Sequence, residues 1–364
     1  MQFSDQKKNF YPSLEGLRGI AIISVIIYHN FPYGNLFFGW LGVDLFFVLS
    51  GFLITGILIK SVYPIRRPGF LKNFYMRRVL RIFPLYYLFL FAFLFLFPAM
   101  GIFNEEVKEY QHNSLWFIFY LQNWLFTNNF PVNSHSLNHF WSLAVEEQFY
   151  IIWPVVIIIL RKPENLVIFL ISFLVFLFAA RCLIWNVHYP GFNYNTFYTF
   201  TRFDGICIGS LVALIVFLKK DFLKYHTATI ITVLAIFNFI FYFFDLSGGL
   251  PYLAFVGYTT FASMFGILVY ELTQNESSFL KTIFEFNFLI FFGRISYGLY
   301  MFHWPVHYFI NKPVVNFLNT HLHWKNVYND LLTSLLTTII SLILSMASYY
   351  FFETKFLQLK EKFR

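Results

Sequence analysis

The chain has 364 residues, of which 58% are hydrophobic and 12% are charged, and its formal net charge is +8. Soluble domains carry about 25% charged residues, so the composition excludes an ordinary soluble domain and indicates a polytopic membrane protein. The positive charge does not imply a nucleic-acid partner, because Lys and Arg gather in the cytoplasmic loops of membrane proteins. The two cysteines, Cys182 and Cys207, lack metal-ligand spacing, so we expect neither a metal site nor a disulfide framework.

Ten segments are apolar and long enough to cross a bilayer as helices. A further apolar stretch, 115–127, is shorter and contains Gln122 and Asn123, so it is predicted to be re-entrant or to lie at the interface. The sequence therefore predicts an all-α, polytopic helical bundle, which forms a single membrane domain over 1–364 with no appended soluble domain. The ten predicted spans are 17–32, 39–60, 80–98, 140–160, 166–186, 201–218, 228–245, 252–272, 288–310 and 331–352.

Loop charges predict the orientation of these spans. Basic residues gather in the connection 61–79 and in the C-terminal tail, whereas the large loop 99–139 contains a cluster of glutamates. The positive-inside rule then places both termini in the cytoplasm, which requires an even number of spans. The first apolar run carries Arg18 and follows a polar stretch, so it is expected to remain as the signal anchor of a multi-pass protein of the cell (inner) membrane.

The first span carries a cation and an imidazole at helical spacing. Arg18 and His29 are eleven residues apart, which is almost three turns, so both side chains point the same way with a rise of roughly 16 Å between them. Ionisable groups inside a membrane are costly, and we therefore interpret both as functional. The alternative is that Arg18 extends to the headgroups while His29 lies at the far interface.

The second span carries Asp44, seven residues before Gly51 on the same helix face. A carboxylate at this depth needs a cationic partner such as Arg or protonated His, and glycine permits a close helix contact. Asp44 is therefore predicted to support the site. A purely structural ion pair is the alternative.

Arg78 and Arg81 lie at the start of the third span and share a helix face at i, i+3. Guanidinium groups bind phosphates bidentately, so this pair suits a phosphate-rich ligand such as coenzyme A. The alternative is a positive-inside anchor that binds lipid phosphates.

Glu146 and Glu147 are adjacent at the entrance of the fourth span. They point about 100° apart, so at most one of them can face His29 directly. A carboxylate beside an imidazole fixes its tautomer and stabilises its protonated form. The alternative is that both acids stabilise the start of the helix.

The ninth span carries a polar seam, since Ser296, Tyr300, His303 and His307 fall on one helical stripe. Such a stripe in an apolar helix indicates a face toward the bundle interior or a cavity. His303 is either a functional residue or a buried, hydrogen-bonded one. Pro305 is expected to kink the helix.

Four of these stretches occur in one order along essentially the whole chain. They are Arg-x10-His at Arg18 and His29, Arg-x-x-Arg at Arg78 and Arg81, Trp-Ser-Leu-x-x-Glu-Glu-Gln-Phe-Tyr at 141–150, and Ser-Tyr-x-x-Tyr-x-x-His at 296–303. Together they resemble the integral-membrane acyltransferase family 3, which includes O-antigen acetylases. The resemblance implies transfer of an acyl group, most often acetyl, from cytoplasmic acyl-CoA to a glycan hydroxyl on the outer side. Acetyl-CoA is then a co-substrate, and no permanently bound cofactor is expected.

The resemblance and the predicted depths together suggest how the donor is held. Arg78 and Arg81, together with Arg18, are expected to bind the phosphates of coenzyme A. Its pantetheine arm then threads outward through a narrow channel along the first helix toward His29.

The reaction is expected at the outer end of that channel. His29 either deprotonates the acceptor hydroxyl or carries the acyl group covalently. Glu146 or Glu147 is expected to orient His29, while Tyr300 and His303 stabilise the oxyanion or bind the sugar.

Two other classes of protein remain open from the sequence. A proton-coupled exporter of glycan or lipid also uses intramembrane Arg, Asp, Glu and His, although such transporters are typically built from repeats, and none is visible here. A membrane scaffold leaves the intramembrane charges unexplained.

Overall fold

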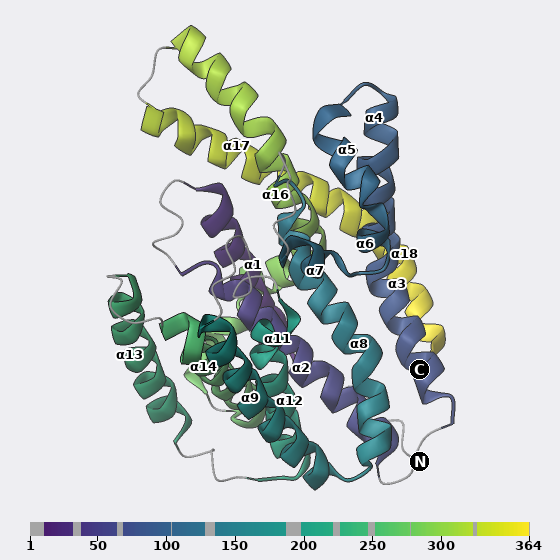
Figure 1. Ribbon diagram of the computed structural model, residues 1–364, viewed down its shortest axis with the longest axis vertical. Helices are drawn as coiled ribbons and strands as arrows, with labels where there is room; N and C mark the ends of the chain where they lie inside the picture. The colour runs from purple at the N-terminus through teal and green to yellow at the C-terminus, as the bar shows by residue number, and fades with distance from the viewer. Residues whose placement is uncertain are drawn as a thin grey trace.

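The structure is a computed structural model that describes residues 11–31, 38–63, 68–102, 104–127, 135–186, 198–220, 226–246, 252–276, 278–322 and 326–363. Within these ranges the chain forms helices and no strand, which confirms the predicted all-α bundle (Figure 1). The longer helices are α1 (Pro12–Asn30), α2 (Leu41–Val62), α3 (Phe70–Phe91), α8 (Trp141–Leu160), α9 (Pro163–Asn186), α12 (Asp204–Phe217), α13 (Thr227–Leu246), α14 (Tyr258–Gln274), α16 (Asn287–Leu322) and α17 (Asn326–Ala347).

Shorter segments extend or connect these helices. π-helical turns continue α3, precede α14 and continue α17. The shorter segments are η3 (Ala92–Leu96), α4 (Phe97–Ala99), α5 (Asn104–His112), α6 (Ser114–Ile118), α7 (Gln122–Thr127), η4 (Asn138–Phe140), α11 (Thr199–Arg202), η6 (Leu253–Gly257), α15 (Phe279–Phe284), η7 (Ser348–Glu353), α18 (Thr354–Leu359) and η8 (Lys360–Phe363).

Each of the ten predicted spans falls on a helical stretch of the described chain. By length and composition, 7 helices in the described residues qualify as membrane spans, whereas α12 is shorter, with 14 residues. The stretch 115–127 forms the two short helices α6 and α7, neither of which is long enough to cross a bilayer. The count of ten spans and the cytoplasmic placement of both termini stay predictions.

Two helices are longer than predicted. α3 begins at Phe70, before the predicted span 80–98, so the helix extends beyond the apolar stretch and carries Arg78 and Arg81, which line a cavity. α16 continues through Pro305 and Pro313 for 36 residues, which is roughly 54 Å at 1.5 Å per residue. This exceeds a hydrocarbon core of about 30 Å, and Figure 1 shows the end of α16 extending beyond the other helices at the top of the view.

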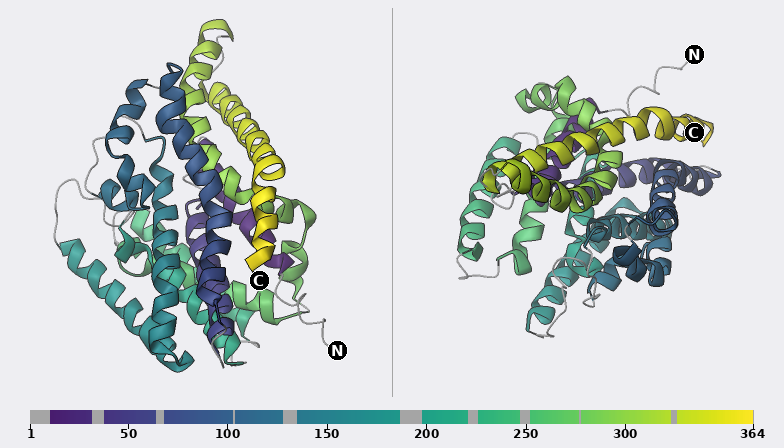
Figure 2. Two further views of the ribbon diagram at one scale, coloured as in Figure 1. Left: turned by 90° about the vertical axis from the view of Figure 1, so that its right-hand side faces the viewer. Right: turned by 90° about the horizontal axis from the view of Figure 1, so that it is seen from above.

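The helix α1 lies among helices from distant parts of the chain. α1 packs against both α16 and α2, and α2 in turn packs against α12. α17 returns along α16, and the C-terminal segments α18 and η8 then run beside α3 (Figure 2). Segments from the start, the middle and the end of the chain therefore surround the same interior.

Glycines allow two of these contacts to be unusually close. A Cβ on Gly293 of α16 would lie 1.9 Å from the backbone oxygen of Glu15 on α1. Likewise, a Cβ on Gly51 of α2 would lie 2.1 Å from the backbone oxygen of Ile206 on α12. The close helix contact predicted at Gly51 is thus confirmed, with small residues letting backbones approach as in other membrane helix pairs.

Gly51→Ala is expected to destabilise the bundle, because the new methyl group would meet backbone that cannot give way. Overpacking of this kind costs roughly 1–3 kcal/mol, which should appear as a lower unfolding midpoint of the purified protein in detergent. Gly56 is the matched control on the same helix, since nothing lies within 4 Å of its Cβ position. Gly56→Ala should leave the midpoint unchanged or raise it slightly. Equal loss in both variants would contradict the close-contact account.

Candidate active site

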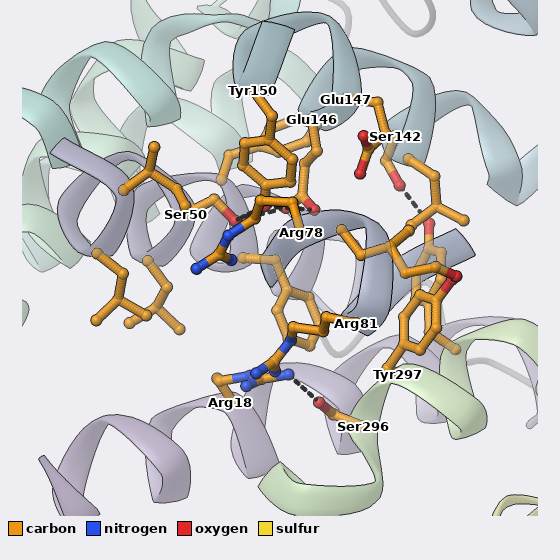
Figure 3. Close-up of a pocket in the computed structure, with 18 of the residues that line it drawn as sticks. Arg18, Ser50, Arg78, Arg81, Ser142, Glu146, Glu147, Tyr150, Ser296 and Tyr297 are labelled. Atoms are coloured by element: carbon orange, nitrogen blue, oxygen red, sulfur yellow. Dashed lines mark hydrogen bonds between the residues drawn. The ribbon is translucent and has the colours of Figure 1, made fainter. Parts of the chain in front are cut away.

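Two neighbouring cavities lie inside the bundle. The first, of about 280 Å³, is lined by Arg18, Arg78 and Arg81, and we call it the arginine cavity (Figure 3). The second, of about 500 Å³, is lined by residues that include His29 and His139, and we call it the histidine cavity. Val43 and Tyr300 line both, so they form the partition between them. The continuous channel expected from the sequence is therefore two compartments in this structure.

α1 connects the two compartments, as its spacing predicts. Arg18 lines the arginine cavity and His29 lines the histidine cavity. Both side chains also reach α16: Arg18 Nη2 donates to Ser296 Oγ at 2.9 Å, and His29 contacts His303. This face of α1 therefore packs against α16 in the interior of the bundle, and the functional roles of Arg18 and His29 stay predictions.

The arginine cavity carries more positive than negative charge. Arg18 forms an ion pair with Glu15 at 3.4 Å, but within the described residues neither Arg78 nor Arg81 forms one. Arg78 instead lies over the rings of Phe74 and Tyr150, and its Nε has no hydrogen-bond partner there. Figure 3 shows these guanidinium groups pointing into the cavity. A cationic cavity of this kind favours an anionic ligand.

The C-terminal tail also contributes to this cavity. Lys360 of η8 adds a cationic side chain to its lining, as does Arg77 of α3. The negative charges in the same lining are the carboxylates of Glu15, Glu146 and Glu147. The sequence assigned Lys360 only to a basic tail. Its position at the cavity depends on the packing of η8 against α3, which no local pattern specifies.

Glu146 and Glu147 do not orient His29, contrary to the prediction. Both line the arginine cavity, where Glu146 accepts hydrogen bonds from Ser50 Oγ at 2.8 Å and from the Tyr150 hydroxyl at 3.3 Å. One oxygen of Glu147 has no partner among the described residues. The prediction was wrong because the rotation of α8 about its axis, set by its packing, turns both acids toward the arginines.

His303 is the partner of His29. His29 Nδ1 lies 3.1 Å from His303 Nε2, and His303 Nδ1 lies 2.8 Å from the carbonyl oxygen of Tyr300 and 3.1 Å from that of Leu299. Carbonyl oxygens only accept, so His303 Nδ1 carries the hydrogen and its Nε2 carries the lone pair. His29 Nδ1–H must then donate to His303, which leaves the lone pair on His29 Nε2. These hydrogen bonds therefore leave His29 Nε2 free to accept a proton as a base.

Tyr300 is fixed across the partition. Its hydroxyl donates to the carbonyl oxygen of His139 at 2.7 Å and lies 2.6 Å from Ser142 Oγ, which can donate to it. His139 lines the histidine cavity and Ser142 lines the arginine cavity. The predicted seam of α16 thus faces the interior at Ser296, Tyr300 and His303, which confirms the interpretation of the stripe.

Asp44 has the cationic partner that its depth requires. Arg202 Nη2 lies 3.1 Å and 3.2 Å from the two carboxylate oxygens of Asp44. Both side chains are buried, and Arg202 also lines the histidine cavity. Arg202 was not among the site residues predicted from the sequence. The signal that could have found it is its place at the start of the sixth predicted span, at the depth of Asp44.

The chain matches the family model described as "Acyltransferase domain" over residues 11–350. It is 32% identical to O-acetyltransferase OatA of Staphylococcus aureus over 362 residues, which is 95% of this chain and 57% of that protein. It is also 32% identical over 376 residues to the protein YrhL of Bacillus subtilis, covering 97% of this chain and 56% of YrhL. Peptidoglycan O-acetyltransferase OatA of Listeria monocytogenes is 29% identical over 366 residues, covering 95% of this chain and 56% of that protein.

The chain therefore spans a little over half the length of these relatives. No solved structure matches it. The apolar helices and these relatives make it a multi-pass membrane protein. The family match covers nearly the whole sequence and contains the residues that line both cavities, apart from Lys360, and the chain therefore belongs to the integral-membrane acyltransferases of acyltransferase family 3.

Proposed function

We propose that this protein is a membrane O-acyltransferase that moves an acetyl group from cytoplasmic acetyl-CoA to a hydroxyl of a cell-envelope glycan on the opposite side of the membrane. The Listeria monocytogenes and Bacillus subtilis relatives, whose names include peptidoglycan O-acetyltransferase, support a cell-wall acceptor. The observation that carries the proposal is the His29–His303 pair, which leaves a basic nitrogen on His29 next to a cavity, one partition away from a cluster of arginines.

The arginine cavity is the proposed donor site. Coenzyme A carries phosphate groups, and Arg78 and Arg81 offer guanidinium donors without an ion-pair partner among the described residues. Arg18, between Glu15 and Ser296, adds a third guanidinium on α1. Planar guanidinium groups match phosphate oxygens bidentately, which holds the ligand in one orientation.

The histidine cavity is the proposed reaction site. His29 Nε2 takes the proton of the acceptor hydroxyl, the hydroxyl oxygen bonds to the thioester carbonyl carbon, and the carbon–sulfur bond breaks. The thiolate of coenzyme A leaves and takes the proton from His29, which returns to its neutral form. His303 accepts a hydrogen bond from His29 Nδ1–H throughout and stabilises the imidazolium, so it positions the base.

The route from donor to acceptor crosses Tyr300 and Val43. The thioester must reach His29 from the arginine cavity, and these two side chains are shared by both cavities. The hydroxyl of Tyr300 is held by groups at both sides of the partition, so the ring must turn or the thioester must pass beside it.

Proteoliposomes containing the purified protein test this function. Radiolabelled acetyl-CoA is supplied on one face only, a soluble glycan acceptor is enclosed on the other, and labelled glycan and released coenzyme A are counted. We expect both products in equal amounts, and only for vesicles with the arginine cavity facing the donor. Movement of glycan without release of coenzyme A would instead identify an exporter.

A further inference from the structure

A third, smaller cavity adjoins the arginine cavity. It has a volume of about 170 Å³, and its lining includes Ser61 of α2, Asn73 of α3 and Phe363 of η8, so we call it the tail cavity. Arg77 and Arg78 line both this cavity and the arginine cavity, which places two guanidinium groups at the boundary between them. The tail cavity therefore continues the interior space beyond the arginine cavity.

The three cavities follow one another along α2. Val43 lines the histidine and arginine cavities, and Ile57 lines the arginine and tail cavities. Ser61, one turn further along the helix, lines the tail cavity. From Val43 to Ser61 the helix rises roughly 27 Å at 1.5 Å per residue. The tail cavity thus lies at the end of the arginine cavity that is farther from the histidine cavity.

The C-terminal segment lies at the junction of the arginine and tail cavities. η8 packs against α3 (Figure 2), where Lys360 lines the arginine cavity and Phe363 lines the tail cavity. In a 3₁₀-helix such as η8, side chains three residues apart share a face, so one face of η8 presents both residues. Within the described residues Lys360 forms no ion pair. Both residues follow position 350, where the match to the family model ends, so the family match assigns them no role.

The arginine cavity is too small for a whole molecule of coenzyme A. Cavities that bind drug-sized ligands usually measure about 300–1,000 Å³, and coenzyme A is longer than most such ligands because it joins a nucleotide to a pantetheine arm. The arginine cavity measures about 280 Å³. In the proposed function the thioester points toward the histidine cavity, so the nucleotide lies at the opposite end, next to the tail cavity.

The lining of the tail cavity suits an aromatic base. Phe70 and Phe74 are buried side chains of this lining, and Phe363 adds a third ring. Aromatic side chains stack on nucleobases, because every base has a π-face. Asn73 and Ser61 bring an amide and a hydroxyl group, which can bond the edges of a base. A cavity of about 150 Å³ is known to bind benzene, so the tail cavity has the size for one ring system.

We propose that the tail cavity binds the adenine of coenzyme A, with Phe363 stacked on the base and with Lys360 and the two boundary arginines bound to the phosphates. The inference rests on the proposed function, in which coenzyme A is the donor. It goes further in giving the donor one direction through the protein, with the base at η8 and the thioester at Tyr300. It also makes the C-terminal segment a part of the donor site.

The test uses the full chain in nanodiscs of a zwitterionic lipid and two probes that cannot react. Adenosine 3′,5′-bisphosphate contains the base and ribose phosphates of the donor without the pantetheine arm, whereas inorganic pyrophosphate has two phosphate groups and no base. Dissociation constants are measured by isothermal titration calorimetry. We expect the nucleotide to bind at least about tenfold more tightly than pyrophosphate, because stacking adds to the phosphate contacts. A site for phosphate alone, such as a lipid headgroup site, would bind both probes equally.

Two variants separate the base from the phosphates. Phe363→Leu keeps an apolar side chain and removes the ring, so it should weaken nucleotide binding by at least about fivefold and leave pyrophosphate binding unchanged. Lys360→Gln removes a cation, so it should weaken binding of both probes by at least about fivefold and raise the KM for acetyl-CoA. Lys362→Gln is the matched control, because Lys362 lies on the same segment, is exposed and lines none of the three cavities. It should bind both probes within about twofold of the wild type.

Equal binding of the nucleotide and pyrophosphate would overturn the inference, as would unchanged nucleotide binding in Phe363→Leu. Equal loss in Lys360→Gln and Lys362→Gln, or no nucleotide binding by the wild-type protein, would overturn it as well, even where acetyl transfer is intact. Nucleotide binding as expected, in a protein that releases no coenzyme A from acetyl-CoA, would instead refute the proposed function and leave the nucleotide site standing.

Discussion

Replacement of His29 by alanine is expected to lower the rate of acyl transfer by about 10²- to 10⁴-fold, the usual contribution of a general base. The hydrogen bonds of His303 leave the lone pair on His29 Nε2, and His29 lines the cavity where the acceptor is proposed to bind. The measurement is the initial rate of labelled product formation at saturating acetyl-CoA, with unfolding midpoints recorded to show that the variant remains folded.

His307→Ala is the matched control for His29. His307 lies on the same seam of α16, but its ring bonds to Thr337 and Asn311 and does not line the histidine cavity. We expect its transfer rate to stay within about threefold of the wild type, an order-of-magnitude margin for a residue that touches no reacting group. Near-normal turnover of His29→Ala would show that His29 is not the general base.

His303 is expected to affect the rate of acyl transfer by positioning His29, and not by contacting the substrates. His303→Leu removes the acceptor of the His29 Nδ1 hydrogen bond, so the tautomer and the ring orientation of His29 are no longer fixed. We expect kcat to fall by about 10- to 10³-fold, less than a full loss of the base, with the KM for acetyl-CoA unchanged. His303→Gln can still offer an acceptor, and it should recover part of the rate. A change confined to KM would show that His303 only supports the donor site.

Features that depend on one helix were predictable from the sequence. The spacing of Arg18 and His29 fixes their relative direction, whatever surrounds them, and the structure places both toward the interior. The same holds for Arg78 and Arg81, and for the stripe on α16, where an i, i+3, i+4 pattern is a property of the helix itself.

Features that depend on how helices turn toward one another were not predictable. The sequence gives no rotation for α8 about its axis, so the expectation that Glu146 or Glu147 orients His29 was wrong, and both acids line the arginine cavity. The partner of Asp44 lies 158 residues away in the chain, which no local pattern encodes. The division of the interior into two cavities depends on the Tyr300 ring and its bonds to another helix segment.

The arginine pair should control the affinity for the donor. Arg78→Gln and Arg81→Gln each remove a cation that lines the cavity and has no ion-pair partner in the described chain. Hydrogen bonds to charged groups contribute about 1.5–3 kcal/mol, so each variant should raise the KM for acetyl-CoA by roughly 10- to 150-fold, with a smaller change in kcat.

A donor without the nucleotide provides the decisive comparison for this pair. S-acetyl pantetheine carries the same thioester and lacks the phosphates, so its KM should already be high in the wild type and should change little in either variant. Arg161→Gln is the control for general loss of positive charge, because Arg161 is exposed at the end of α8 and lines neither cavity. If the variants raise the KM for both donors equally, the arginines shape the cavity and do not bind phosphate. If only acetyl-CoA is affected, the phosphates lie at Arg78 and Arg81, and the thioester must reach His29 past Tyr300.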